Sequence, residues 1–191
     1  FDLDVARLRY FGGTTNHWAG WCRTFEKEDF DRGYLGDKFK WPITFKDLNL
    51  FKDHACKILE IPNSFHDIPI DGSKIRKIGF NFSPPVRFRE KYYENLTNDP
   101  MVHVFINANL TDIKFKKKKI TALYIDSYKK IKAVVNAKKF VFAMGGIENS
   151  RYLLWLYKKY GNSFIANNSS LGRYWMEHPH FTLGQAIVDR R

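Results

Sequence analysis

A glycine-rich loop near the start of the chain holds the densest group of residues suited to contacting a ligand. The loop reads Gly12, Gly13, Thr14, Thr15, Asn16, His17 and Trp18. Two adjacent glycines let a backbone approach a ligand closely or adopt positive φ angles. The hydroxyl and amide groups that follow, beside backbone N–H donors, suit a diphosphate or a flat polar heterocycle. A tight turn anchored by a buried aromatic side chain is the alternative, and the loop alone leaves both interpretations open.

A second candidate site lies where a predicted strand ends in two glycines. The apolar residues 140–144 lead into Gly145 and Gly146, and a helix is expected over residues 147–160, with Asn149 in its first turn. A helix that begins directly after glycines exposes backbone N–H groups and the positive end of its dipole. Ligands collect at the carboxyl ends of parallel strands. Ordinary strand–helix packing, with glycine chosen for clearance, is the competing interpretation.

The residue types and their spacing give little support for a metal site or for a catalytic nucleophile. His178 and His180 are separated by Pro179 and lack a third ligand nearby, so no metal site is expected. The two cysteines, Cys22 and Cys56, are too few for a disulfide framework, and their spacing does not indicate zinc. The sequence also lacks a serine nucleophile elbow, a P-loop and a complete Gly-x-Gly-x-x-Gly fingerprint.

The elements that must position these loops follow from hydrophobic spacing. Thr44 and Asp47 form a predicted capping box for a helix that ends before Pro62. A shorter helix is expected over residues 87–96, after an irregular stretch over residues 63–86. Short β-like runs are expected at residues 102–106, 120–125, 133–135 and 140–143. The predicted fold class is therefore α/β or mixed α+β, with an antiparallel β-meander.

The composition excludes several classes of protein. The 191 residues are 44% hydrophobic and 17% aromatic, which is too much for a disordered chain. No apolar run is long enough to span a membrane. The net charge of +12 suggests nucleic acid at first sight. However, residues 111–140 hold ten lysines and two aspartates, a net +8, and lysines that flank short strands commonly keep sheet edges soluble.

Six stretches, taken together, resemble the glucose–methanol–choline (GMC) family of flavin oxidoreductases, in particular its sugar dehydrogenase and pyranose oxidase branch. They are residues 9–20, 41–48, 83–88, 107–111, 143–151 and 171–179. The last contains Gly172, Arg173, His178 and Pro179, which is similar to the family's Gly-Arg-x-x-x-x-His-Pro element. The order and spacing of the six stretches are far more specific than any one of them.

The resemblance implies an FAD cofactor and assigns its contacts. Gly12, Gly13, Thr14, Thr15 and Asn16 would line the flavin and its diphosphate. Leu110 would offer backbone groups to the adenine, and Gly145, Gly146 and Asn149 belong to the return turn and helix that approach the FAD. His17 aligns with the histidine that carries a covalent flavin bond in pyranose oxidases, although an aromatic-packed histidine near the ring is the alternative.

The resemblance also predicts how the chain is divided. Residues 1–60 would hold the flavin-contacting loop and the next helix, and residues 61–100 part of the substrate domain. Residues 101–165 would form the meander and return strand–helix of a Rossmann-like FAD domain, and residues 166–191 a further substrate-domain segment. The family's diphosphate fingerprint and its catalytic histidine pair have no counterpart here, so the chain reads as an internal fragment that neither binds FAD tightly nor turns over substrate alone.

The expected function is hydride transfer to FAD from the CH–OH group of a sugar or related alcohol, with an electron acceptor that the sequence does not identify. No catalytic residue is assigned within this chain. The rival interpretation is a basic module that binds nucleic acid or another anion, for which the lysine-rich meander is the evidence.

Overall fold

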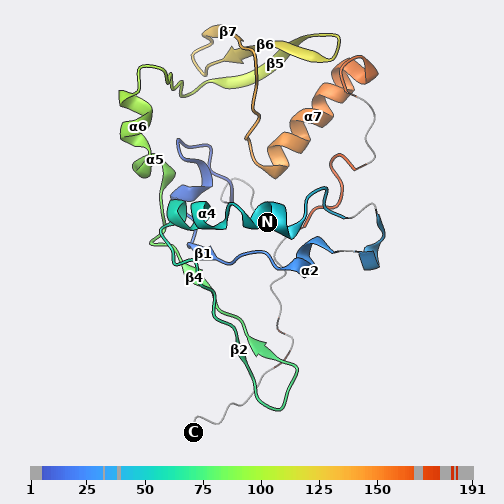
Figure 1. The fold of residues 1–191 in the computed structure, drawn as a ribbon. Helices are drawn as coiled ribbons and strands as arrows, with labels where there is room; N and C mark the ends of the chain where they lie inside the picture. Colours follow the sequence, from blue (N-terminus) through green and yellow to red (C-terminus); the bar gives the residue numbers. More distant parts are fainter. Residues whose placement is uncertain are drawn as a thin grey trace. The chain divides into compact units, whose positions relative to one another are not determined.

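The computed structural model describes residues 6–31, 33–37, 40–165, 170–176, 182 and 184. The chain divides into two compact units, Phe1–Ile106 and Asn107–Arg191. Helices and small antiparallel sheets alternate along the chain, which confirms the predicted mixture of α and β elements. Figure 1 shows these elements in sequence order.

The first unit consists of short elements joined by long connections. Its helices are η1 (Gly13–Asn16), α2 (Lys27–Phe30), η2 (Gly33–Leu35), α3 (Phe45–Asn49), α4 (Lys52–Leu59), α5 (Phe88–Lys91) and α6 (Tyr93–Asn98). Its strands are β1 (Trp21–Cys22), β2 (Ile68–Pro69), β3 (Arg76–Lys77) and β4 (Asn81–Phe82). Strand β1 pairs with β4, and β2 pairs with β3, both antiparallel.

The capping box at the start of α3 is confirmed. The Thr44 hydroxyl accepts a hydrogen bond from the Asp47 backbone N–H, and the Asp47 carboxylate accepts one from the Thr44 N–H at 2.8 Å. The prediction of one continuous helix is wrong, because the chain turns at Leu50 between α3 and α4. Helix α4 ends at Glu60, whose φ of +57° places it in the left-handed region. The Ile61 N–H then bonds back to the Cys56 carbonyl, which satisfies the helix end before Pro62.

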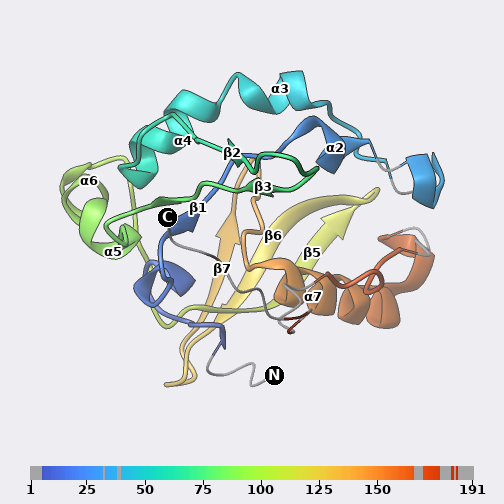
Figure 2. The ribbon, with the colours of Figure 1, turned by 90° about the horizontal axis from the view of Figure 1, so that it is seen from below.

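The second unit is a three-stranded sheet with one long helix beside it. Strands β5 (Asn109–Lys116), β6 (Lys119–Asp126) and β7 (Lys132–Asn136) form an antiparallel meander in that order. Figure 2 shows the three strands side by side, with helix α7 (Gly146–Tyr160) next to β5 and the short η4 (Gly161–Ser163) after it. The predicted helix over residues 147–160 is thus confirmed, and the antiparallel meander is confirmed in part, because β6 and β7 cover the expected runs 120–125 and 133–135.

The core of the second unit forms where α7 packs against the sheet. Ile113 of β5, with Tyr152 and Leu156 of α7, are its buried residues. Tyr152 and Leu156 are four residues apart and therefore lie on one face of the helix. At the far end of α7, Lys159 and Tyr160 both bond to the Asp112 carboxylate, at 2.6 and 2.8 Å. The helix is therefore held to β5 by apolar and by polar contacts.

Two predicted strands are absent from the described part of the chain. Residues 102–106 and 140–143 form no strand, and Phe105 and Val141 are 79% and 90% exposed. A strand is stable only when another backbone pairs with it, and neither run has such a neighbour among the described residues. All strand pairs that the structure describes are antiparallel, so the parallel sheet of a Rossmann domain is not among them. No helix of the described residues is long and apolar enough to cross a membrane.

Candidate functional site

The Gly12–His17 loop is a compact turn held by its own side chains. Gly12 has a φ of +91° and precedes the single turn of η1. The Thr15 hydroxyl donates to the Gly12 carbonyl at 2.6 Å. The Asn16 amide donates to the carbonyls of Phe11 and Gly13, at 3.1 and 2.7 Å. These bonds use both donors of Asn16 and the donor of Thr15, so the two side chains shape the loop and keep only acceptor oxygens for a ligand.

A second stretch, residues 83–88, lies about seventy positions further along the chain and holds this loop in place by hydrogen bonds. The Arg87 guanidinium donates to the carbonyls of Thr15 and Trp18, at 2.7 and 3.2 Å. The Trp18 indole donates to the Val86 carbonyl at 2.9 Å, and the Phe88 N–H donates to the Thr15 hydroxyl at 3.1 Å. Two of the six stretches that carry the family resemblance therefore form one hydrogen-bonded structure.

Close backbone contact explains the first glycine of the loop. A Cβ at Gly12 would lie 2.8 Å from the backbone nitrogen of Arg89, and the positive φ would strain any other residue. A Cβ at Gly13 would meet no described atom within 4 Å, although its φ is +58°. The first glycine is thus required by packing inside the unit, whereas the second leaves open space beside the loop.

Two side chains of the loop face solvent. Thr14 and His17 are exposed, while Gly12, Gly13, Thr15 and Asn16 are half-buried. The His17 backbone N–H donates to the Thr14 carbonyl at 3.2 Å, which fixes the backbone between them. Of the polar side chains predicted to contact a cofactor, the outward Thr14 and His17 are therefore the most accessible.

In the second unit, the Gly145–Gly146 turn leaves room at the start of α7. Gly145 is the N-cap, with a φ of +85°, and no side chain in the described part of the chain caps the first N–H groups of the helix. A Cβ at either glycine would meet no atom of the described residues within 4 Å. Asn149 is occupied instead, because its amide donates to the Phe142 carbonyl at 3.1 Å and its Oδ1 accepts from the Met144 N–H at 3.4 Å. Asn149 thus holds the turn, and the glycines provide the open surface.

Leu110 lies near the start of β5, opposite Ile125 of β6. Its side chain packs against the core of the second unit. A register shift follows directly between Leu110 and Asp112, and β5 lies at one edge of the three-stranded sheet. In an edge strand, every second residue turns its backbone N–H and C=O away from the sheet, so β5 can offer backbone groups to a ligand along this edge.

The predicted residues thus form two groups. The structure brings residues 12–17 together in the first unit, and Gly145, Gly146 and Asn149 in the second. His178 and His180 lie outside the described residues. The described part of the chain contains no cluster of three or more His, Cys, Asp or Glu side chains that could hold a metal ion.

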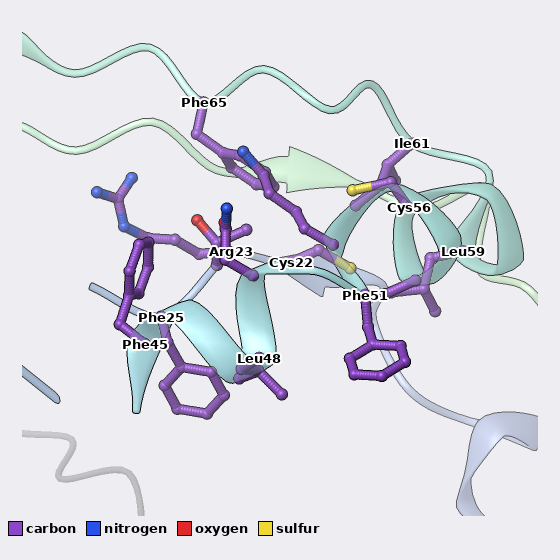
Figure 3. A pocket seen from close by; sticks show the side chains of 14 residues that line it. Cys22, Arg23, Phe25, Phe45, Leu48, Phe51, Cys56, Leu59, Ile61 and Phe65 are labelled. Atoms are coloured by element: carbon purple, nitrogen blue, oxygen red, sulfur yellow. The ribbon is translucent and has the colours of Figure 1, made fainter. Parts of the chain in front are cut away.

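An apolar cavity in the first unit was not predicted from the sequence. It has a volume of about 270 Å³ and lies among β1, α3, α4 and the segment after α4. Figure 3 shows side chains from these elements around one hollow, among them Cys22, Phe51, Cys56 and Phe65. The periodic apolar face of α3 and α4 was the available signal, but the sequence does not say which segment completes the wall.

A charged network beside the cavity ties the β2–β3 hairpin to the segment after β1. Arg23 donates to both oxygens of Asp67 at 2.8 Å and to the Gly79 carbonyl at 2.8 Å. Arg76 bonds to Glu26 at 2.6 Å, and Glu26 also accepts from Arg23. The hydrogen bond from Arg23 is the largest cause that lowers the pKa of Asp67 to about 2. Arg23 is therefore fully engaged within the protein.

No model of a known protein family, no curated protein and no solved structure matches this chain.

Proposed function

We propose that this chain is part of an FAD-dependent oxidoreductase that acts on the CH–OH group of a sugar or related alcohol. The observation that carries the proposal is the hydrogen bonding between the Gly12–Trp18 loop and residues 83–88. Both stretches belong to the same flavin-enzyme resemblance, and their mutual locking is what a rigid cofactor-contacting loop requires. A Rossmann-like FAD-binding domain remains part of the proposal.

The residues present fit a dinucleotide in two respects. The uncapped start of α7, with open space at Gly145 and Gly146, can receive a negatively charged phosphate. The Gly12–His17 loop presents Thr14 and His17 outward on a fixed backbone. When bound, FAD would supply the acceptor for the hydride of the alcohol. The contribution of this chain is to bind and orient that group, since no residue in it is assigned as the catalytic base.

FAD binding can be followed residue by residue in the 191-residue chain. Amide chemical shifts would be recorded during titration with FAD to millimolar concentration, because the expected binding is weak. Riboflavin should perturb residues 12–17, and ADP should perturb Leu110 and the turn at Gly145 and Gly146. Unchanged shifts in both groups with all three compounds would overturn the proposal.

A substitution at the loop surface provides a matched test. Thr14→Val removes an exposed hydroxyl while preserving the shape of the side chain, and it should weaken the riboflavin response several-fold without moving the unfolding midpoint. Thr97→Val changes another exposed threonine, in α6, whose hydroxyl donates to the Tyr93 carbonyl, and it should leave the riboflavin response unchanged. Equal weakening by both variants would mean that the effect is not local to the loop.

The reading frame that contains this sequence offers an independent test. The proposal expects a Gly-x-Gly-x-x-Gly fingerprint before residue 1 and a histidine-containing catalytic pair after residue 191. A reading frame that holds neither feature would contradict membership of a flavin oxidoreductase, whatever the titration shows.

A second candidate function is binding of nucleic acid or another polyanion, and one observation favours it. The lysines of the meander turns are exposed, and no carboxylate pairs with them among the described residues; they are Lys116, Lys117, Lys118, Lys119, Lys129 and Lys130. Binding to an oligonucleotide, with affinity that falls steeply as salt rises, would support this function.

A further inference from the structure

The wall of the cavity in the first unit is mainly apolar, and the described residues that line it include no carboxylate. Its lining consists of Phe25, Phe45, Leu48, Phe51, Ala55, Leu59, Ile61 and Phe65, with Cys22, Cys56, Thr24, Asn49, Arg23 and Lys52. Burial is the largest cause that raises the pKa of the Cys22 thiol, while Phe25 and Phe51 on the same wall remain exposed. An apolar cavity of about 150 Å³ is enough to bind benzene, so 270 Å³ accommodates a larger apolar body.

Among the described residues, Arg23 and Lys52 are the cations that line the cavity, and carboxylates engage Arg23 but not Lys52. Arg23 is neutralised by Asp67 and Glu26. The Lys52 ammonium lies 5.3 Å from the centre of the Phe65 ring, which holds it against the cavity wall. No carboxylate within the described ranges pairs with Lys52. Its neighbour in sequence, Asp53, accepts a hydrogen bond from the Asn63 amide and does not line the cavity.

We propose that this cavity binds a small amphipathic carboxylate, with its apolar chain or ring among the phenylalanines and its carboxylate at Lys52. The charges on the wall determine which kind of molecule binds. Because Lys52 is available and the described lining includes no acidic side chain, an anion should bind better than a neutral or cationic molecule. This site lies within the first unit, and it is independent of the flavin contacts proposed above.

Octanoate and octanamide form a pair of probes that separate charge from apolar size. Binding to the full 191-residue chain would be measured by isothermal titration calorimetry. Octanoate should bind about fivefold more tightly than octanamide, the factor that a single partly exposed ion pair supplies. Equal affinity of the two probes would overturn the proposed role of Lys52.

Substitutions on α4 supply matched variants. Lys52→Met keeps the apolar stem and removes the charge, so it should reduce octanoate binding about fivefold and leave octanamide binding unchanged. Lys57→Met removes an exposed lysine of the same helix that does not line the cavity, and it should change neither affinity. Ala55→Phe fills the cavity and should abolish binding of both probes.

The two cysteines report occupancy directly, because both line the cavity. Octanoate should slow the reaction of Cys22 and Cys56 with N-ethylmaleimide in the wild-type chain, with no slowing in Ala55→Phe. If millimolar octanoate leaves the reaction rates of both thiols unchanged, the proposal is overturned. Protection that instead rises with protein concentration, together with a dimer in sedimentation, would also overturn it and identify the wall as an interface between copies.

Discussion

Two tyrosines of α7 differ in how their hydroxyl groups are satisfied. The Tyr160 hydroxyl donates to Asp112 at 2.8 Å. The Tyr152 hydroxyl is buried and has no hydrogen-bond partner among the described residues. Burial is the largest cause that raises the pKa of Tyr152 to about 12. The ring of Tyr152 therefore contributes to the core, while its hydroxyl costs stability.

Removing each hydroxyl should change stability in opposite directions. Tyr152→Phe is expected to raise the free energy of unfolding by about 1 kcal/mol, because it deletes a buried group without a partner. Tyr160→Phe is expected to lower it by about 1 kcal/mol, because Asp112 loses a donor. Urea denaturation of the two variants and the wild type measures both changes. Destabilisation by Tyr152→Phe would show that its hydroxyl is in fact satisfied.

The charged network around Arg23 makes the first unit sensitive to acid. The folded protein lowers the pKa of Asp67 from 3.8 to about 2, chiefly through the hydrogen bond from Arg23. A lowered folded-state pKa stabilises the fold fully above the unfolded value, and this stabilisation is lost as the pH falls toward the folded value. The loss should therefore occur between about pH 4 and pH 2.

Asp67→Asn tests this pH dependence. The variant should be less stable than the wild type at pH 6, and the difference should shrink as the pH falls from 4 to 2, because the wild type then loses the same charge. Thermal midpoints measured across this range give the result. Asp71→Asn, an exposed position at the tip of the same hairpin, should follow the wild-type curve. A constant difference between Asp67→Asn and wild type at all pH values would contradict the explanation.

Among the secondary-structure elements, local signals predicted some helices better than they predicted strands. The Thr44–Asp47 capping box and the helix over residues 147–160 depend on neighbours within a few positions, and both are confirmed. The runs over residues 102–106 and 140–143 have the composition of strands, but a strand depends on a partner backbone that the local pattern does not reveal. Strand β5 was not among the predicted strands, although Ile113, Lys114, Phe115 and Lys116 alternate between apolar and charged side chains; the lysines of this segment were assigned to turns.

The candidate site shows the same limit. Glycines and small polar residues mark the Gly12–Asn16 loop in the sequence. They do not reveal that the side-chain donors of Thr15 and Asn16 form hydrogen bonds with carbonyl groups of the loop itself. The lock formed by Arg87 and the apolar cavity near Cys56 both depend on residues far apart in the chain. Such tertiary contacts follow from packing, and one sequence does not specify them.

Substitutions in the turn between β5 and β6 can raise the stability of the protein. Lys117 and Lys118 form its two-residue loop with φ angles of +49° and +61°. This left-handed conformation suits asparagine and glycine and is strained for lysine. The double variant Lys117→Asn with Lys118→Gly should raise the free energy of unfolding by about 1–2 kcal/mol, as measured by urea denaturation. Lys119→Gly, placed inside β6, should lower it by about 1 kcal/mol.

At the scale of the whole molecule, the distribution of charge along the chain affects stability more than the net charge does. Residues 111–140 account for a net +8 of the +12, from ten lysines and two aspartates. Lys116 and Lys119 lie directly opposite each other across the β5–β6 ladder, which places like charges side by side. Among the described residues, the ion pair that involves this segment joins Asp112 to Lys159 of α7. The second unit therefore carries a repulsion that its own structure does not cancel.

Salt should stabilise this protein by screening that repulsion. Raising sodium chloride from 50 mM to 500 mM shortens the screening length from above 10 Å to below 8 Å, so the lysines of the meander repel each other less. A gain of about 1 kcal/mol would raise the thermal midpoint by roughly 2–4 °C for a chain of this size. The double variant Lys129→Gln with Lys130→Gln removes two of these charges and should show a higher midpoint in low salt and a smaller response to added salt. A midpoint that falls with salt would mean that the attraction between Lys159 and Asp112 and the pairs around Arg23 outweighs the repulsion among the lysines.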